Sequence, residues 1–192
     1  MKTLKIPFLL GLVAILLNSC GYNSMIEQQE TVDQKWANVQ TQYQRRADLI
    51  DNLVATVKGA AENEKEILTG VIEARSKATS MNINADQLTP ENIKKFQAAQ
   101  SQLSGAFSKL LVSVERYPEI KSNQNFRDLQ VQIEGTENRI AVARNDFNGA
   151  VKIYNSSIRK FPRNLIAGWF DFEKKGYFEA DTGSENAPKV EF

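Results

Sequence analysis

The chain has 192 residues, the length of one ordinary domain, and carries 24 Lys and Arg against 23 Asp and Glu, a net charge of +1. This balance lacks the basic excess that is typical of nucleic-acid-binding proteins, so no nucleic-acid partner is expected. The sequence has no histidine and a single cysteine, Cys20. That composition excludes Ser-His-Asp and Cys-His catalysis, an internal disulfide and a multi-cysteine zinc site.

The first twenty residues have the pattern of a bacterial lipoprotein signal peptide. Two lysines accompany a 12-residue apolar run over residues 6–17, which is too short to span a bilayer comfortably. The run ends in the sequence LNSC at residues 17–20, which resembles a lipobox, where the cysteine receives fatty acyl chains such as palmitate. We predict a signal peptide over residues 1–19 and a mature chain that begins at Cys20. The alternatives are a plain signal peptide with an unmodified cysteine, or an uncleaved anchor.

Two or more acyl chains on Cys20 would hold the protein stably on a membrane. The positively charged start of the signal peptide stays in the cytoplasm, so the domain is expected to face the periplasm or the outside of the inner membrane.

The rest of the chain has the periodicity of long helices. Between the prolines at 7, 90, 118 and 162, apolar residues recur three and four positions apart through residues 24–82, 91–117 and 119–161. In the last interval this seam consists of Phe126, Leu129, Ile133, Thr136, Ile140, Ala143, Phe147, Ala150, Tyr154, Ser157 and Phe161. Alternation with a period of two is missing, so the pattern predicts an all-α protein.

The region around Gly59 decides the topology. A straight helix over residues 24–82 would leave the apolar stripe of residues 24–55 without a partner. A reversal at Gly59 instead aligns four helices, so we predict an antiparallel up-and-down four-helix bundle over residues 20–162. The alternative is three helices with a very long first helix.

The charged residues nearest the predicted seams include Arg45, Arg46, Glu134, Glu137 and Arg144. We interpret them as an interhelical polar network that fixes helix register, the alternative being a ligand site inside the bundle. If the first helix reverses at Gly59, residue 57 aligns with about residue 120 of the last helix. That alignment predicts that Arg46 pairs with Glu134.

The segment over residues 163–192 contains Trp169, Phe170, Phe172 and Tyr177. It is too aromatic for a disordered tail and is expected to pack on the bundle. The same four residues are a candidate surface for a protein partner or for the membrane.

An aromatic residue followed by asparagine recurs at a seven-residue spacing, at residues 147–148 and 154–155. Because the aromatic residues occupy seam positions, core packing is the expected role of these pairs. The asparagines beside them could bind a partner's backbone or form hydrogen bonds across helices.

Several segments, taken in order, resemble the LemA family of bacterial envelope proteins. They are QRRADLIDNLVATVKG at 44–59, ERYPEIKSNQNFRDLQ at 115–130 and EGTENRIAVARNDFNGAVKIYNSSIRKFP at 134–162. The resemblance implies a helical bundle held at a membrane, with no established enzymatic activity, and it supplies no ligand. Asp51 departs from the family, which often has proline at this position.

These observations predict a lipid-anchored, non-catalytic interaction or scaffold module of the cell envelope, with an envelope protein as its partner. No cofactor and no metal is expected, and the oligomeric state is left open. The alternative is a sensor that binds a small ligand or a peptide in or beside the bundle.

Replacing Cys20 by alanine tests the lipid anchor. Cys20→Ala should block processing and leave a precursor about two kilodaltons heavier than the mature protein, because residues 1–19 are retained. Electrophoresis with membrane fractionation measures both effects. Normal maturation and membrane retention of the variant would contradict acylation at Cys20.

Overall fold

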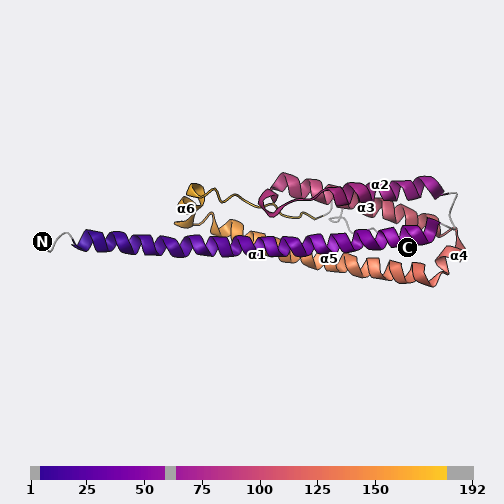
Figure 1. Ribbon diagram of the computed structural model, residues 1–192, viewed down its shortest axis with the longest axis horizontal. Helices are drawn as coiled ribbons and strands as arrows, with labels where there is room; N and C mark the ends of the chain where they lie inside the picture. Colours follow the sequence, from indigo (N-terminus) through magenta and orange to yellow (C-terminus); the bar gives the residue numbers. More distant parts are fainter. Residues whose placement is uncertain (1–4, 59–63, 181–192) are drawn as a thin grey trace, which may run out of the picture.

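The computed structural model describes the backbone of residues 5–58 and 64–180 and the side chains of residues 21–58 and 64–180. Over these residues the chain is helical and forms an elongated rod (Figure 1). The elements are α1 (Lys5–Lys58), α2 (Lys65–Ser80), the 3-10 helix η2 (Ala85–Gln87), α3 (Pro90–Val114), α4 (Pro118–Lys121), α5 (Gln124–Ser157) and α6 (Arg163–Trp169). The prediction of an all-α helical bundle is confirmed.

Helix α1 runs the length of the rod, and α5 lies antiparallel along it (Figure 1). The ion pair between Lys35 Nζ and Asp146 Oδ2, at 2.8 Å, joins the two helices. Helix α1 ends at Lys58 and α2 returns beside it, since Arg75 of α2 forms an ion pair with Asp51 of α1. The predicted reversal point, Gly59, lies outside the described residues.

The buried side chains follow the heptad seams. In α1 the buried residues include Val32, Trp36, Val39, Tyr43, Arg46, Ile50, Leu53 and Val57. In α5 they include Phe126, Ile133, Thr136, Ile140, Ala143, Phe147, Ala150 and Tyr154. Phe161 is the exception, because α5 ends at Ser157 and the Phe161 side chain is 80% exposed. The prediction that Phe161 continues the seam is therefore wrong.

The register between α1 and α5 differs from the predicted one by about six residues. Trp36 packs against Phe147, with ring centroids 5.6 Å apart, so the helices are displaced relative to an alignment of residue 57 with residue 120. The short helix α4 explains the shift. It occupies residues 118–121 and inserts Ile120 into the core, so α5 begins only at Gln124.

Two side-chain caps fix where helices start. The Thr89 hydroxyl accepts a hydrogen bond from the Asn92 amide at 3.3 Å, and Pro90 takes the first position of α3. The Asn123 side chain accepts from the Asn125 amide at 2.9 Å at the start of α5. Both caps follow turns, so they set the points at which the chain reverses.

After α5 the chain folds back on the rod. Helix α6 packs on α1 through Ile166 and Ala167, and residues 173–180 then run along the bundle in extended form. Gly176 comes so close to the start of α3 that its amide donates to the Leu88 oxygen at 2.8 Å. A Cβ at Gly176 would lie 2.7 Å from Pro90 Cα, so glycine is required here by contact with backbone atoms.

Gly176→Ala should therefore lower the free energy of unfolding by about 1–3 kcal/mol, the usual cost of overpacking. Chemical denaturation measures the effect. Gly149→Ala is the matched control, because a Cβ at this position of α5 meets no heavy atom within 4 Å. The control should be neutral or stabilising by up to about 1 kcal/mol, since alanine favours a helix over glycine. Equal stability of the two variants would contradict the close approach.

Candidate functional site

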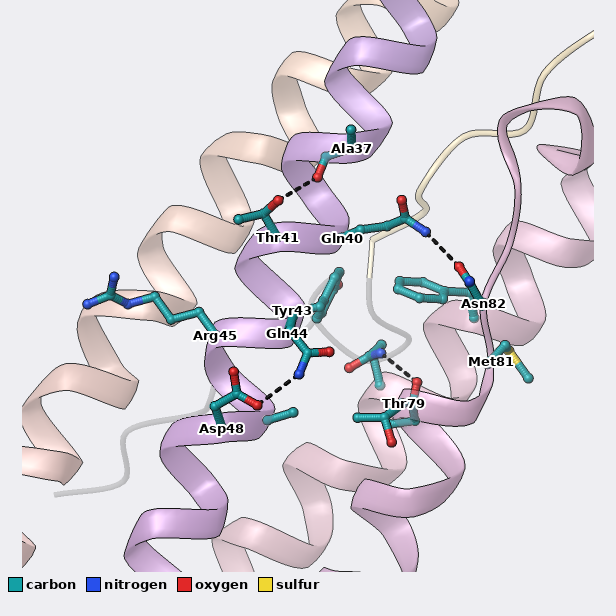
Figure 2. Close-up of a pocket in the computed structure, with 14 residues that line it drawn as sticks. Ala37, Gln40, Thr41, Tyr43, Gln44, Arg45, Asp48, Thr79, Met81 and Asn82 are labelled. Atoms are coloured by element: carbon teal, nitrogen blue, oxygen red, sulfur yellow. Dashed lines mark hydrogen bonds between the residues drawn. The ribbon is translucent and has the colours of Figure 1, made fainter.

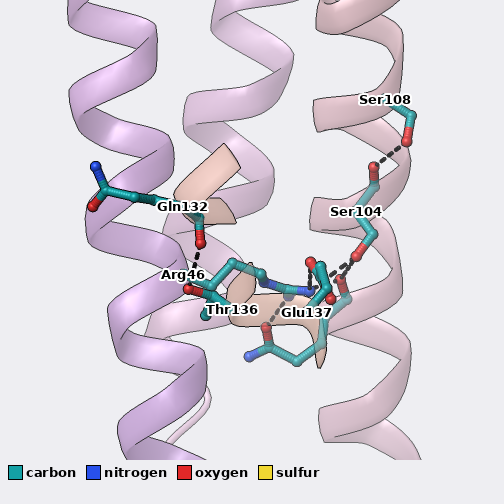
Figure 3. Close-up of polar contacts among 7 residues, drawn as sticks. Arg46, Ser104, Ser108, Gln132, Thr136 and Glu137 are labelled. Atoms are coloured by element: carbon teal, nitrogen blue, oxygen red, sulfur yellow. Dashed lines mark hydrogen bonds and ion pairs between the residues drawn. The ribbon is translucent and has the colours of Figure 1, made fainter. Parts of the chain in front are cut away.

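Arg46 is the polar centre of the bundle and joins α1 to α3 and α5 (Figure 3). Its Nη1 donates to Ser104 Oγ and to Glu137 Oε1, each at 3.0 Å. Its Nη2 donates to Gln100, at 2.6 Å to Oε1 and at 3.3 Å to the backbone oxygen. One guanidinium thus contacts side chains from both neighbouring helices.

The surroundings of Arg46 compensate a buried charge. The residue is only 2% exposed, and a charge removed from water needs a partner and hydrogen bonds. The Glu137 side chain supplies the opposite charge while remaining 46% exposed to solvent. The guanidinium also lies over the Tyr43 ring, 5.1 Å from its centroid. These contacts are those of an interhelical brace.

The other predicted polar residues lie apart from Arg46. Glu134, the expected partner, accepts a hydrogen bond from Gln130 one turn earlier in α5, at 3.1 Å. Glu137 replaces it because of the shifted register. Arg45 is exposed and lies in the wall of a cleft. Arg144 donates to the Glu179 backbone oxygen at 2.8 Å, in the C-terminal segment.

Three side-chain amides bind the backbone of residues 175–179; we call Gln97, Asn148 and Asn155 the amide clamp. Asn155 donates to the Lys175 oxygen at 2.9 Å and accepts from the Lys175 amide at 3.0 Å. Asn148 makes the same pair of bonds with Phe178, both at 2.9 Å. Gln97 does so with Glu179, at 2.9 and 3.2 Å. The asparagines of the seven-residue repeat therefore bind the chain's own backbone.

A polar cluster beside the extended segment consists of Tyr154 and Lys175, which are buried, and Asp33, which is partly exposed. Burial raises the pKa of the Asp33 carboxyl, and the charge of Lys175 opposes that rise. Burial also raises the pKa of Tyr154 to about 12. The Lys175 ammonium donates to the Ala85 oxygen at 2.9 Å, which ties the segment to the turn before α3. Sequence patterns gave no signal for Gln97, Asp33 or Lys175, because their partners are distant backbone groups or charges.

An open cleft of about 750 Å³ lies between α1 and the α2–α3 pair (Figure 2). Its wall on α1 carries Gln40, Gln44, Arg45 and Asp48. Gln40 Nε2 donates across the cleft to Asn82 Oδ1, at 3.1 Å. The lining offers hydrogen-bonding groups and one charge of each sign, without a concentration of either charge.

The four predicted aromatic surface residues have different environments. Trp169 is 81% exposed, Phe170 59% and Tyr177 42%. Phe172 is partly buried and packs edge-on against Tyr22 of α1, with ring centroids 5.7 Å apart. Phe170 and Phe172, which follow α6, therefore both contact Tyr22, close to the first residue of α1 whose side chain is described.

Neither a metal-binding cluster nor a membrane-spanning helix is present within the described residues. No cluster of three or more carboxylate or thiol side chains there could hold a metal ion. No helix in that part of the chain is both long and apolar enough to cross a membrane. The side chain of Cys20 lies outside the described residues.

Comparison with known proteins reveals one family. A sequence profile of the LemA family matches residues 35–192. The magnetosome proteins MamQ 1 and MamQ 2 of Paramagnetospirillum magneticum are each 27% identical over 175 residues, which cover 82% of this chain and 64% of theirs. Protein LemA of Metamycoplasma hominis is 23% identical over 158 residues, 82% of this chain and 68% of that protein. The chain therefore spans less than two thirds of the length of these MamQ proteins.

A double-mutant cycle tests the role of Arg46. Arg46→Met combined with Glu137→Gln should show a coupling energy of about 0.5–3 kcal/mol in the free energy of unfolding, because the two groups are in contact. Glu134→Gln is the matched control, one turn away on α5, and should show no coupling to Arg46→Met. Coupling to Glu134 in place of Glu137 would restore the register predicted from sequence.

Proposed function

Because the chain belongs to the LemA family, we propose that it is a lipid-anchored, non-catalytic scaffold of the cell envelope. None of the relatives' names denotes a reaction: they are magnetosome proteins and a LemA protein. The interior is compatible with the same role, since the buried Arg46 guanidinium is engaged in an interhelical brace. The proposal has two parts, an anchor at one end of the rod and a protein-binding face along it.

The anchor follows from the position of Cys20 at the start of the bundle. From residue 21 to Lys58, α1 rises about 55 Å at 1.5 Å per residue. Helix α4 lies at the same far end of the rod as the end of α1 (Figure 1). Acyl chains on Cys20 would hold the near end at the bilayer and leave the far end accessible to other proteins.

The observation that carries the scaffold role is a row of three separate apolar side chains exposed on one face of α5, which we call the α5 stripe. Val131, Val142 and Ile153 are 66%, 62% and 61% exposed. They are spaced by eleven residues, close to three helical turns, so they share one face. A shallow groove of about 330 Å³ adjoins Val142 and is lined from both α1 and α5. Apolar side chains aligned in this way suit the apolar face of a partner helix.

Site-specific photo-crosslinking in living cells tests this face. A benzophenone amino acid at Val142 should crosslink to one defined envelope protein, and the same residue at Lys109 should not. Lys109 is the matched control because it is exposed on α3. Val142→Asp should abolish the crosslink made from position 131 without changing the melting temperature, since Val142 contributes little to the core.

Identical crosslinked products from positions 142 and 109, or none from either, would contradict a scaffold that binds through this stripe. The crosslinks are read by mass spectrometry of the purified adducts. A soluble, unprocessed chain in the same cells would contradict the lipid anchor alone. The crosslinks from positions 131 and 142 test the stripe independently of the anchor.

A second candidate function, a sensor, rests on the cleft between α1 and the α2–α3 pair. Its polar lining and its volume of about 750 Å³ suit a small polar ligand or a short peptide. A ligand that binds only the folded state raises the melting temperature, and the rise grows with the logarithm of the ligand concentration above the dissociation constant. A ligand whose effect is removed by Gln44→Leu would favour the sensor over the scaffold.

A further inference from the structure

Four large apolar side chains cluster in the segment that links α5 to the extended tail. Phe161, Leu165, Trp169 and Phe170 are 80%, 54%, 81% and 59% exposed, and we call them the α6 platform. Leu165 and Trp169 are four residues apart and share the outer face of α6. Several exposed side chains of this size within ten residues indicate a surface that meets something apolar.

The inner face of α6 fixes where the platform lies. Ile166 and Ala167 are buried against α1. A Cβ at Gly21 would lie 3.5 Å from Ile166 Cδ1, and the Tyr22 ring is 4.9 Å from that of Phe170. Helix α6 is therefore level with residues 21–22, at the end of the bundle from which the first part of α1 projects (Figure 1).

That level coincides with the expected bilayer surface. An acylated Cys20 would stand one residue before Gly21. If the apolar run over residues 6–17 were instead retained in the bilayer, residue 22 would lie about 8 Å along the helix axis beyond residue 17, the end of that run. In either case the platform lies at the depth where aromatic side chains concentrate in membrane proteins.

The charges around the platform are compatible with lipid headgroups. Residues 159–174 contain four basic residues, Arg159, Lys160, Arg163 and Lys174, against Asp171 and Glu173. Lysine and arginine favour contact with phosphate groups, while their aliphatic stems can lie along the apolar region. A net positive charge beside exposed aromatic rings is typical of a segment that lies in a membrane interface.

We propose that the α6 platform inserts into the interface of the bilayer to which the chain is anchored. This inference rests on the proposed membrane anchor and deepens it. One attachment at residue 20 would leave the rod free to rotate about α1. A second attachment through α6 fixes which face of the rod points toward the membrane and which toward a partner.

The two tryptophans provide the test. The full-length, processed protein is reconstituted into phosphatidylcholine vesicles, once as wild type and once as Trp169→Phe. The difference between their emission spectra isolates Trp169, while Trp36, only 2% exposed in the core, is common to both. Vesicles that carry bromine near the top of the acyl chains should quench the difference signal by about twofold, since an interfacial side chain reaches 5–10 Å into the boundary.

The Trp36 signal of Trp169→Phe should remain unchanged in brominated vesicles, which controls for nonspecific quenching. Co-sedimentation of the protein with the vesicles, together with a Trp169 signal that is quenched by iodide and unaffected by bromine, would overturn the platform and leave the anchor intact. A blue-shifted Trp169 signal that bromine does not quench would overturn the platform and assign the surface to a contact with a second copy of the chain. Failure to sediment with vesicles would overturn both the anchor and the platform.

Discussion

One aromatic side chain from the tail completes the core on which the rest of the rod depends. Phe178 packs against Trp36 of α1, with ring centroids 6.1 Å apart, and against Phe147 of α5 at 5.6 Å. Phe96 of α3 completes the group, 5.1 Å from Trp36. Three helices and the tail therefore share one packed cluster. Withdrawal of Phe178 would expose the interior, so the tail is a structural part of the bundle, and α6 before it is held against α1.

The register of α1, α3 and α5 is set by polar groups, because apolar packing alone permits several alignments of the helices. A seam of aliphatic side chains tolerates sliding, but Arg46 finds its partners in one alignment of α1, α3 and α5. The amide clamp fixes the register of the tail in the same way. Each side-chain amide donates to the backbone oxygen and accepts from the backbone N–H of a single residue. Replacing a buried ion pair by apolar groups of similar volume is often neutral for stability, so we infer that these polar groups contribute mainly to specificity.

The sequence predicted the helices and their buried faces well, since heptad spacing is a local property. It did not predict the register. Helix α4 inserts Ile120 between α3 and α5. No local sequence pattern reveals that residues 118–121 form a separate helical turn before α5 begins. For the same reason the partner of Arg46 is Glu137 and not Glu134. The aromatic-asparagine repeat showed where two amides of the clamp lie, but their ligand, the backbone of residues 175–178, has no sequence signature.

The feature on which the rest of the rod depends most is therefore the fixed position of residues 173–180 along the bundle. Hydrogen exchange of the amides of these residues measures this directly in the wild-type protein. The amides of Lys175, Gly176, Phe178 and Glu179 donate to Asn155, Leu88, Asn148 and Gln97 at 2.8–3.2 Å. They should exchange slowly, with protection close to that of the α1–α5 core, because they open only when Phe178 leaves its cluster. Exchange of these four amides at the rate of an unstructured peptide would contradict the account.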